Sequence, residues 1–242
     1  MFRFFRKMRN SLLSENKFTR YFFYALGEIF LVVIGILIAL QVNNWNENRK
    51  TKTFEKVILT QLKESLKRDL KVLNNNISQL KKSFKTSTWI IENYETSGEI
   101  SNVIIDSIPG TMPYVAFPVD YAAYKQLESK GIDIISNKDL RIAITEYYEN
   151  TTKWMVFSIN KYEHEFKAIN DEWLTENYHL IDSTSIFNWS PNNREFLITD
   201  KHTMDLIYNR RTFSNANFRQ HQPIVNRISE IIDSINSELE KD

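Results

Sequence analysis

The chain has 242 residues, with 31 Lys and Arg against 30 Asp and Glu, four His and no Cys. The part of the chain after residue 42 has no basic patch of the kind that binds nucleic acid, and the absence of Cys excludes disulfides and a Cys nucleophile. The charge is unevenly distributed, because residues 1–42 carry six cations and two acids while the rest of the chain carries 25 cations and 28 acids.

The first predicted element is a transmembrane helix over residues 21–42. Its sequence, YFFYALGEIFLVVIGILIALQV, contains Glu28 as its single charged residue. A run of this length matches the ~20 helical residues that cross ~30 Å of hydrocarbon. Aromatic residues near both ends suit the headgroup level, because their rings are apolar and their polar tips stay hydrated. A cleaved signal peptide is the competing interpretation, but its apolar region would be shorter, and the residues after Leu40 offer no A-x-A-like cleavage site.

The basic residues around this segment predict its orientation. Residues 1–20 contain six Lys and Arg against one acid, whereas the fifteen residues after Val42 contain four against two. The positive-inside rule therefore places residues 1–20 in the cytoplasm as a basic tail. In a bacterium, this predicts a single-pass inner-membrane protein whose residues 43–242 form a helical periplasmic domain. The tail also has an apolar helical face, so it either lies on anionic headgroups or only sets the topology.

One face of the predicted membrane helix is unusual. At helical spacing it combines four residues: Glu28, Leu31, Gly35 and Ala39. A carboxyl group inside a span suggests a function or a partner, and a small-xxx-small pair lets helix backbones approach closely. We therefore predict a helix–helix interface, with a second copy or with another membrane protein. The alternative is a tolerated acid near the membrane surface together with small residues that occur by chance.

Beyond the membrane segment, apolar residues recur at helical spacing between sparse Gly and Pro residues. The first of these helices is predicted over about residues 45–95, without a breaker after Val42, and has a buried stripe from Phe54 to Ile91. The stripe could be the seam of a parallel coiled-coil dimer, but its early four-residue repeat favours packing within a bundle. Residues 99–118 read as an irregular or briefly extended connector.

The second half of the chain continues the helical pattern. A short helix is predicted over residues 120–129, with Gly131 as its C-cap, followed by one long helix from Asn137 to Asn177. A polar loop around residues 182–191 leads to a final helical region, and the last piece of this region has Pro223 in its first turn. The sequence thus predicts an all-α fold, in which an N-terminal transmembrane helix continues into an antiparallel helical bundle outside the membrane.

Aromatic residues dominate the apolar stripe of the predicted helix over residues 137–177. Four of them are candidates for lining a ligand pocket: Tyr147, Trp154, Tyr162 and Trp173. Aromatic stripes at helical spacing more often belong to a core, and a core role is the favoured interpretation.

The sequence gives little support for catalysis. The four His residues are scattered without the spacing of metal ligands, and the chain has no G-x-S-x-G elbow, P-loop or G-x-G-x-x-G motif. We therefore predict a protein that is not an enzyme and that uses no metal or cofactor.

Two blocks of the sequence carry a resemblance to a known family. The first is LLSENKFTRYFFYALGEIFLVVIGILIALQVNNWNE, and the second includes Tyr124, Leu127, Ser129, Gly131, Ile135, Leu140-Arg141 and Tyr147-Tyr148. Together they resemble a family of uncharacterised bacterial membrane proteins with a domain of unknown function. The resemblance implies a single-span, mostly helical protein of Gram-negative bacteria, and it implies no activity or cofactor.

These observations predict a membrane-anchored interaction or sensory module. The alternative is a periplasmic bundle that binds a small ligand or an envelope component, with a hydrolase as a third reading. The expected partners are the lipid bilayer and another membrane or envelope protein or a second copy, but not nucleic acid.

Overall fold

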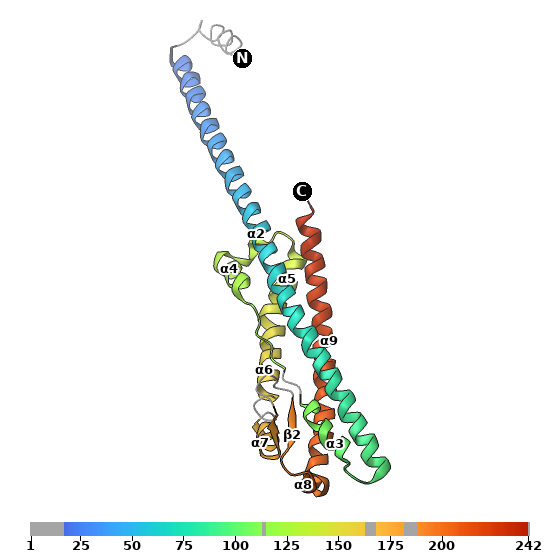
Figure 1. The fold of residues 1–242 in the computed structure, drawn as a ribbon. Helices are drawn as coiled ribbons and strands as arrows, with labels where there is room; N and C mark the ends of the chain where they lie inside the picture. Colours follow the sequence, from blue (N-terminus) through green and yellow to red (C-terminus); the bar gives the residue numbers. More distant parts are fainter. Residues whose placement is uncertain (1–16, 113–114, 163–167, 182–187, 242) are drawn as a thin grey trace. The chain divides into compact units, whose positions relative to one another are not determined.

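The computed structural model describes residues 17–112, 115–162, 168–181 and 188–241 (Figure 1). Its longest element is α2, Lys17–Ser97, a helix of 81 residues. The chain divides into two compact units, Met1–Phe54 and Glu55–Asp242, and α2 contributes residues to both.

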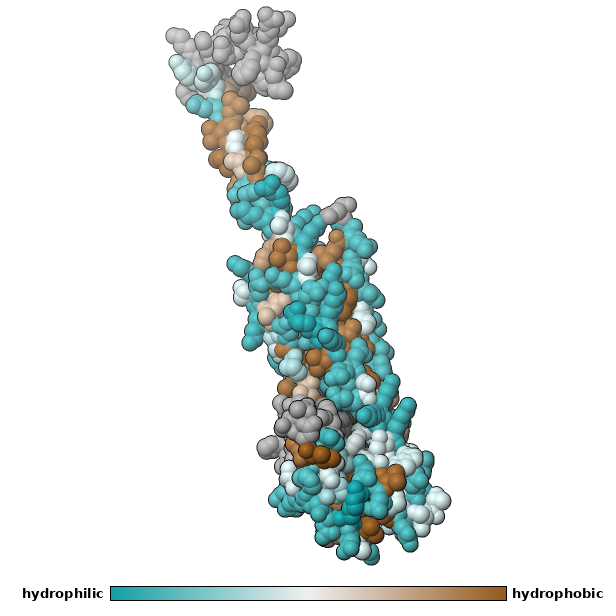
Figure 2. Space-filling view, in the orientation of Figure 1, coloured by the Kyte–Doolittle hydropathy of each residue, from teal (hydrophilic) through white to brown (hydrophobic). Residues whose placement is uncertain are grey.

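The first unit contains the apolar part of α2. Every side chain from Tyr21 to Val42 is exposed, and Figure 2 shows this stretch as a largely hydrophobic surface. Within the described residues, α2 is the one helix that is long and apolar enough to cross a membrane. The helix predicted over residues 21–42 is therefore confirmed, and its length and composition suit a membrane span.

The second unit is a helical bundle, so the predicted all-α fold is confirmed. After α2 its elements are α3 Asn102–Ser107, η1 Ile108–Thr111, α4 Ala122–Lys130, η2 Ile132–Ile134, α5 Lys138–Glu146, η3 Tyr147–Thr151, α6 Thr152–Tyr162, α7 Ala168–Asn177, α8 Arg194–Thr199 and α9 Lys201–Leu239. A short antiparallel hairpin of β1, Tyr178–Leu180, and β2, Trp189–Pro191, lies between α7 and α8.

The long helices of this unit pack in antiparallel pairs. Ser83 of α2 hydrogen-bonds Ser214 of α9 at 2.7 Å, and farther along α2 the hydroxyl of Tyr208 donates to Glu95 at 2.9 Å. Later residues of α2 thus contact earlier residues of α9, so the two helices are antiparallel. Buried apolar residues such as Ile58, Leu66 and Leu80 form the predicted stripe of α2.

The connector predicted over residues 99–118 as irregular or briefly extended is helical over residues 102–111, in α3 and η1, whereas its described residues 115–118 are irregular as predicted. Ser101 caps α3, because its hydroxyl accepts a hydrogen bond from the N–H of Ile104. One turn of helix then places Ile104, Ile105 and Ile108 in a core shared with α7, β1, α8 and α9. Tertiary burial of three isoleucines therefore decides the conformation of a segment whose β-branched residues favour a strand.

The predicted helix from Asn137 to Asn177 is also not one regular α-helix. Asn137 caps α5 as predicted, with its side chain accepting from the N–H groups of Asp139 and Leu140. Residues 147–151 then form the π-helix η3, which inserts one extra residue into the turn. This insertion lets two consecutive residues, Tyr147 and Tyr148, both lie fully buried.

The predicted final helical region is present as α8 and α9, but no separate helix begins at Pro223. The carboxylate of Asp200 caps α9 by accepting from the N–H of His202, and Pro223 lies inside the helix instead of in its first turn. Buried residues continue on both sides of the proline, from Phe213 to Ile228. This packing offsets the hydrogen bond that a proline removes from a helix.

Candidate functional site

The predicted interface face lies on the exposed part of α2. Leu31 is 70% exposed, and a Cβ atom added at Gly35 would meet no atom within 4 Å. Glu28 borders a shallow depression that it shares with Ala25, Ile29, Val32 and Val33. Among the described side chains, Glu28 has no hydrogen-bond or ion-pair partner. The face is therefore an open apolar surface with one carboxyl group on it.

In the second unit, a row of buried polar side chains runs along α2 at multiples of seven residues. Its members, called here the polar row, are Glu55, Asp69, Asn76 and Ser83. Seven residues make about two helical turns, so these side chains share one face.

Each side chain of the polar row binds a backbone group of a crossing segment. Glu55 accepts from the N–H of Ser136 at 2.7 Å, and Asp69 accepts from the N–H of Asp120 at 3.2 Å. Asn76 donates to the carbonyl of Ala116 at 3.0 Å, and Ser83 donates to that of Thr111 at 2.6 Å. The row therefore supplies hydrogen-bond partners for backbone groups that lie outside the long helices of the bundle.

Four tyrosines gather where η3 meets this row. Tyr148 stacks on Tyr124, with ring centroids 4.5 Å apart, and Tyr147 meets Tyr148 edge-on at 4.9 Å. The ring of Tyr121 lies 5.8 Å from that of Tyr148, and its hydroxyl hydrogen-bonds Thr152 at 2.7 Å. The hydroxyl of Tyr148 is buried and has no hydrogen-bond partner. This tyrosine cluster fills the core beside η3, as aromatic side chains commonly do.

Asp69 is the buried acid of the cluster. The hydroxyl of Tyr147 donates to its Oδ2 at 2.7 Å, while its Oδ1 accepts from the N–H of Asp120. Burial raises the pKa of Asp69, although these two hydrogen bonds act against the shift. Burial and the nearby carboxylate also raise the pKa of Tyr147, so its hydroxyl stays a proton donor to Asp69. Both oxygens of Asp69 are thus occupied within the fold.

The pKa of Asp120 is shifted in the opposite direction, because its carboxylate is bound by Arg68. Its Oδ2 accepts from Arg68 Nη2 at 2.6 Å and Nε at 3.0 Å, and its Oδ1 accepts from the N–H of Ala122. These contacts, led by the Arg68 hydrogen bond, lower the pKa of Asp120. A pair of acids with pKa values moved apart is a common catalytic arrangement. Here, however, the oxygens of both acids hold backbone and side-chain groups in place.

The structure does not bring together the three predicted pocket aromatics whose side chains it describes. Tyr147 lies in the tyrosine cluster, whereas Trp154 is 53% exposed on α6. Trp173 lies in a separate core, with its ring centroid 5.9 Å from that of Tyr178. The side chain of Tyr162 lies outside the described residues.

The π-helix explains the exposure of Trp154. A regular α-helix would continue the buried stripe from Tyr147 to Trp154, seven residues on. With one extra residue in the turn, the stripe passes instead through Tyr148, Thr152 and Met155, which are all buried. The core role favoured for Trp154 is therefore wrong.

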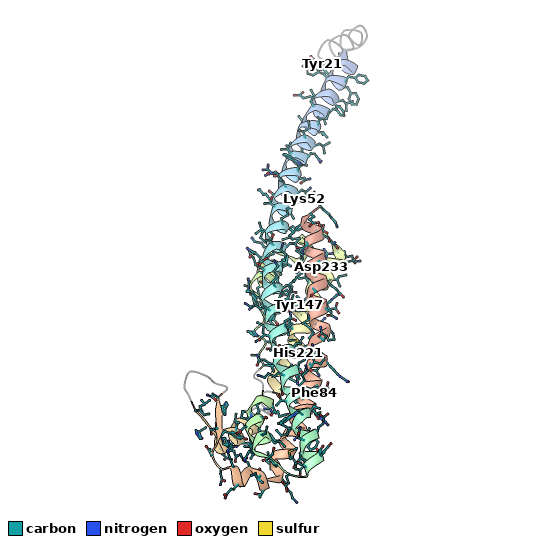
Figure 3. All side chains as sticks on the ribbon, turned by 45° about the vertical axis from the view of Figure 1, so that its right-hand side comes forward. Tyr21, Lys52, Phe84, Tyr147, His221 and Asp233 are labelled. Carbon is teal, nitrogen blue, oxygen red and sulfur yellow. The ribbon has the colours of Figure 1, made fainter. Side chains whose placement is uncertain are left out.

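The three described histidines have different environments. His202 is exposed at the start of α9, and His179 Nδ1 lies 2.7 Å from Asn192 Oδ1. His221 is buried in the bundle (Figure 3), where its Nδ1 lies 2.7 Å from the carbonyl of Asn217, and burial lowers its pKa. His164 lies outside the described residues. In the part of the chain that the structure describes, no group of three or more His, Asp or Glu side chains could hold a metal ion.

Sequence reasoning missed the polar row and the burial of Tyr148. The row has a signal in the sequence, because Asp69, Asn76 and Ser83 interrupt the apolar stripe of α2 at exact seven-residue intervals. The shift of the buried stripe to Tyr148, which the π-helix causes, has no comparable signal in the local sequence.

The fold defines an all-α protein with an apolar helix of membrane-spanning length. More particularly, the chain belongs to the family of unknown function DUF6090, whose model matches residues 28–175. The matched region begins at Glu28 and includes the polar row and the tyrosine cluster. No curated protein and no solved structure matches the chain.

Proposed function

We propose that this protein is a single-pass inner-membrane protein of Gram-negative bacteria that acts as an interaction or sensory module. In this proposal, residues 21–42 are the anchor, residues 1–20 are a cytoplasmic tail and residues 43–242 are a periplasmic domain. Its partners are the bilayer and another membrane or envelope protein or a second copy of the chain.

The observation that carries this proposal is the exposed apolar length of α2. Large side chains from Tyr21 to Val42 have no protein packed against them. Apolar patches of this extent on proteins mark surfaces that are covered by a partner or by lipid. A helix of about 20 apolar residues has the length that a bilayer covers.

The flanking charges support the orientation. Six Lys and Arg precede the span within residues 1–20, and fewer follow it closely. Cytoplasmic flanks carry the excess of cations in bacterial membrane proteins. This places the helical second unit on the periplasmic side.

The hydrogen bonding of Asp69 and Asp120 supports an interaction role over catalysis. Asp69 and Asp120, the acids with shifted pKa values beside the tyrosine cluster, each hold backbone N–H groups with their oxygens. A general acid or base needs an atom within hydrogen-bond reach of its substrate. In this fold, these carboxyl oxygens serve the packing of the bundle.

Single-cysteine labelling tests the anchor and its orientation, because the natural chain contains no Cys. We expect the protein to remain in membranes after a carbonate wash. In spheroplasts, a membrane-impermeant maleimide should label Glu92→Cys, and it should label Ser11→Cys only after lysis. Release by carbonate, or the reverse labelling pattern, would contradict the proposal.

The interaction role is tested on the same membranes after gentle solubilisation. Affinity capture should recover a defined partner with the wild-type chain. A chain in which residues 21–42 are replaced by an unrelated span separates the two surfaces: a partner lost with the replacement binds the anchor, and a partner that is retained binds the second unit. Recovery of no partner and no self-association would count against an interaction role.

A further inference from the structure

We propose that the anchor is also a dimerisation surface, on which the face formed by Glu28, Leu31, Gly35 and Ala39 binds the same face of a second copy. This inference rests on the proposed membrane location of residues 21–42. It goes further by assigning the partner, the face and the residue that makes the contact specific.

Glu28 needs a hydrogen-bond partner within the membrane. It is the single Asp, Glu, Lys, Arg or His between Tyr21 and Val42, and it has no partner among the described side chains. Lipid cannot satisfy a carboxyl group, so ionisable residues within spans face other protein groups or water-filled cavities. The helix surface around Glu28 is otherwise apolar, since its depression is lined by Ala25, Ile29, Val32 and Val33. Because none of the described side chains of this helix binds Glu28, we place its hydrogen-bond partner on a second helix.

A second copy supplies that group at the correct depth. All copies insert with the same orientation, so two of these helices meet in parallel with equal residues at equal depth. A two-fold symmetric contact places a residue against its own counterpart. Glu28 would meet Glu28 of the second copy, and two carboxyl groups that hold a proton between them form a short O–H···O hydrogen bond. Each chain thereby satisfies the polar group that it introduces.

The shape of the face permits this approach. Gly35 lies seven residues, or about two turns, after Glu28, and Ala39 lies one turn farther along the same line. The space around Gly35 is open, with no atom within 4 Å of an added Cβ. Small residues on such a line let two backbones come close enough for interhelical hydrogen bonds. Glu28 together with the small residues Gly35 and Ala39 is therefore the feature that favours a second copy as the partner.

Disulfide scanning of the full-length chain in isolated membranes tests the inference. Single cysteines are placed on the proposed face, as Leu31→Cys, Gly35→Cys and Ala39→Cys, and on the opposite face, as Leu26→Cys, Val33→Cys and Leu37→Cys. After oxidation with copper phenanthroline, we expect the first set to give at least five-fold more product at twice the mass of the chain. Equal yields from both faces, no dimer, or a product of another mass would overturn the inference.

Second substitutions in the Leu31→Cys chain test the roles of Glu28 and Gly35. Glu28→Leu and Gly35→Leu should each lower the dimer yield several-fold, whereas Glu28→Gln should retain it, because amide side chains also hydrogen-bond across helices. Gly27→Leu is the matched control: Gly27 has equally open space but lies about a quarter turn from Gly35. An equal loss from Gly27→Leu and Gly35→Leu, or no loss from Glu28→Leu, would overturn the inference.

A carbonate wash of the same membranes separates the two proposals. Protein that is released by the wash contradicts the anchor and, with it, the dimer. Protein that stays in the membrane but shows no face-dependent crosslinking contradicts the dimer alone.

Discussion

At the residue scale, Tyr147 and Tyr148 are neighbours in η3, and both are buried, yet their hydroxyl groups differ. The hydroxyl of Tyr147 donates to Asp69 at 2.7 Å, whereas that of Tyr148 has no partner. Removing one partner of a buried hydrogen bond costs about 1–3 kcal/mol, and more when the remaining group is charged. Removing a buried hydroxyl that makes no hydrogen bond has no such cost.

We therefore expect different effects on stability from two matched substitutions. Tyr147→Phe should lower the free energy of unfolding by about 1–3 kcal/mol, because Asp69 then keeps only the N–H of Asp120 as a donor. Tyr148→Phe should leave it unchanged or raise it by up to about 1 kcal/mol, since a desolvated hydroxyl is removed. Chemical denaturation of the detergent-solubilised proteins, followed by circular dichroism, measures both. Equal losses from the two substitutions would contradict the hydrogen-bond assignment.

At the element scale, one extra residue in η3 sets the face that α6 buries. The sequence pattern extends the stripe of α5 to Trp154, but the structure buries Thr152 and Met155 and leaves Trp154 largely exposed. Helix periodicity is a local property, and it gives the correct stripe as far as Tyr147. The π-helix follows from the packing of Tyr147 and Tyr148 together against α2 and α4, which involves residues far apart in the sequence.

This register change predicts the relative cost of two adjacent substitutions. Met155→Gln places an amide in the core and should lower the free energy of unfolding by about 2–4 kcal/mol. Trp154→Gln replaces a side chain that is largely in solvent and should change it by less than about 1 kcal/mol. Thermal unfolding of the two variants and the wild type distinguishes them. A larger loss from Trp154→Gln would indicate that α6 keeps the regular α-helical register.

Other elements show the same division between local and long-range information. The caps Asn137 and Gly131 are confirmed, because a cap depends on residues within one or two turns. The helix α3 and the β1–β2 hairpin were not predicted, since their short segments gain order from the core around Ile105 and Tyr178. The prediction of an interface at Glu28, Leu31, Gly35 and Ala39 stays a prediction.

At the scale of the whole molecule, buried titratable groups couple stability to pH. Burial lowers the pKa of His221, so the folded protein binds its proton less readily than the unfolded chain, for which a histidine pKa of about 6.5 applies. Above that pH, His221 is neutral in both states and its full contribution is present. As the pH falls below about 6.5, the unfolded chain takes up a proton and stability is lost down to the folded pKa.

Asp69 acts with the opposite sign, because burial raises its pKa. As the pH falls through its folded value, the folded protein takes up the proton first and gains stability. The two groups therefore have opposite effects on stability as the pH falls, and the contribution of His221 has to be measured as a difference between variants.

We predict that His221→Gln makes the protein less sensitive to acid between pH 7.5 and 5. The wild type should lose up to about 1.4 kcal/mol of unfolding free energy per pH unit, relative to His221→Gln, over the interval between the two His221 pKa values. Denaturation at a series of pH values measures this difference. His202→Gln, which changes an exposed histidine, is the control and should follow the wild type. A parallel pH dependence of His221→Gln and the wild type would contradict the assignment.

The sequence by itself determined the properties that depend on local pattern. The run from Tyr21 to Val42, apolar apart from Glu28 and Gln41, needs no tertiary contact to form a helix of membrane length, and regular apolar spacing determines the long helices of the bundle. The region that the family model matches begins within the same segment, at Glu28.

Only the tertiary structure decided which polar residues are buried and which aromatic residues reach the core. Asp69, Asn76 and Ser83 interrupt an apolar stripe, and they are tolerated because backbone groups at Asp120, Ala116 and Thr111 satisfy their hydrogen bonds. Those partners lie 28 to 51 residues away along the chain. A buried polar group is stable only when its partner is in place, so its position follows from the complete fold and not from the local sequence.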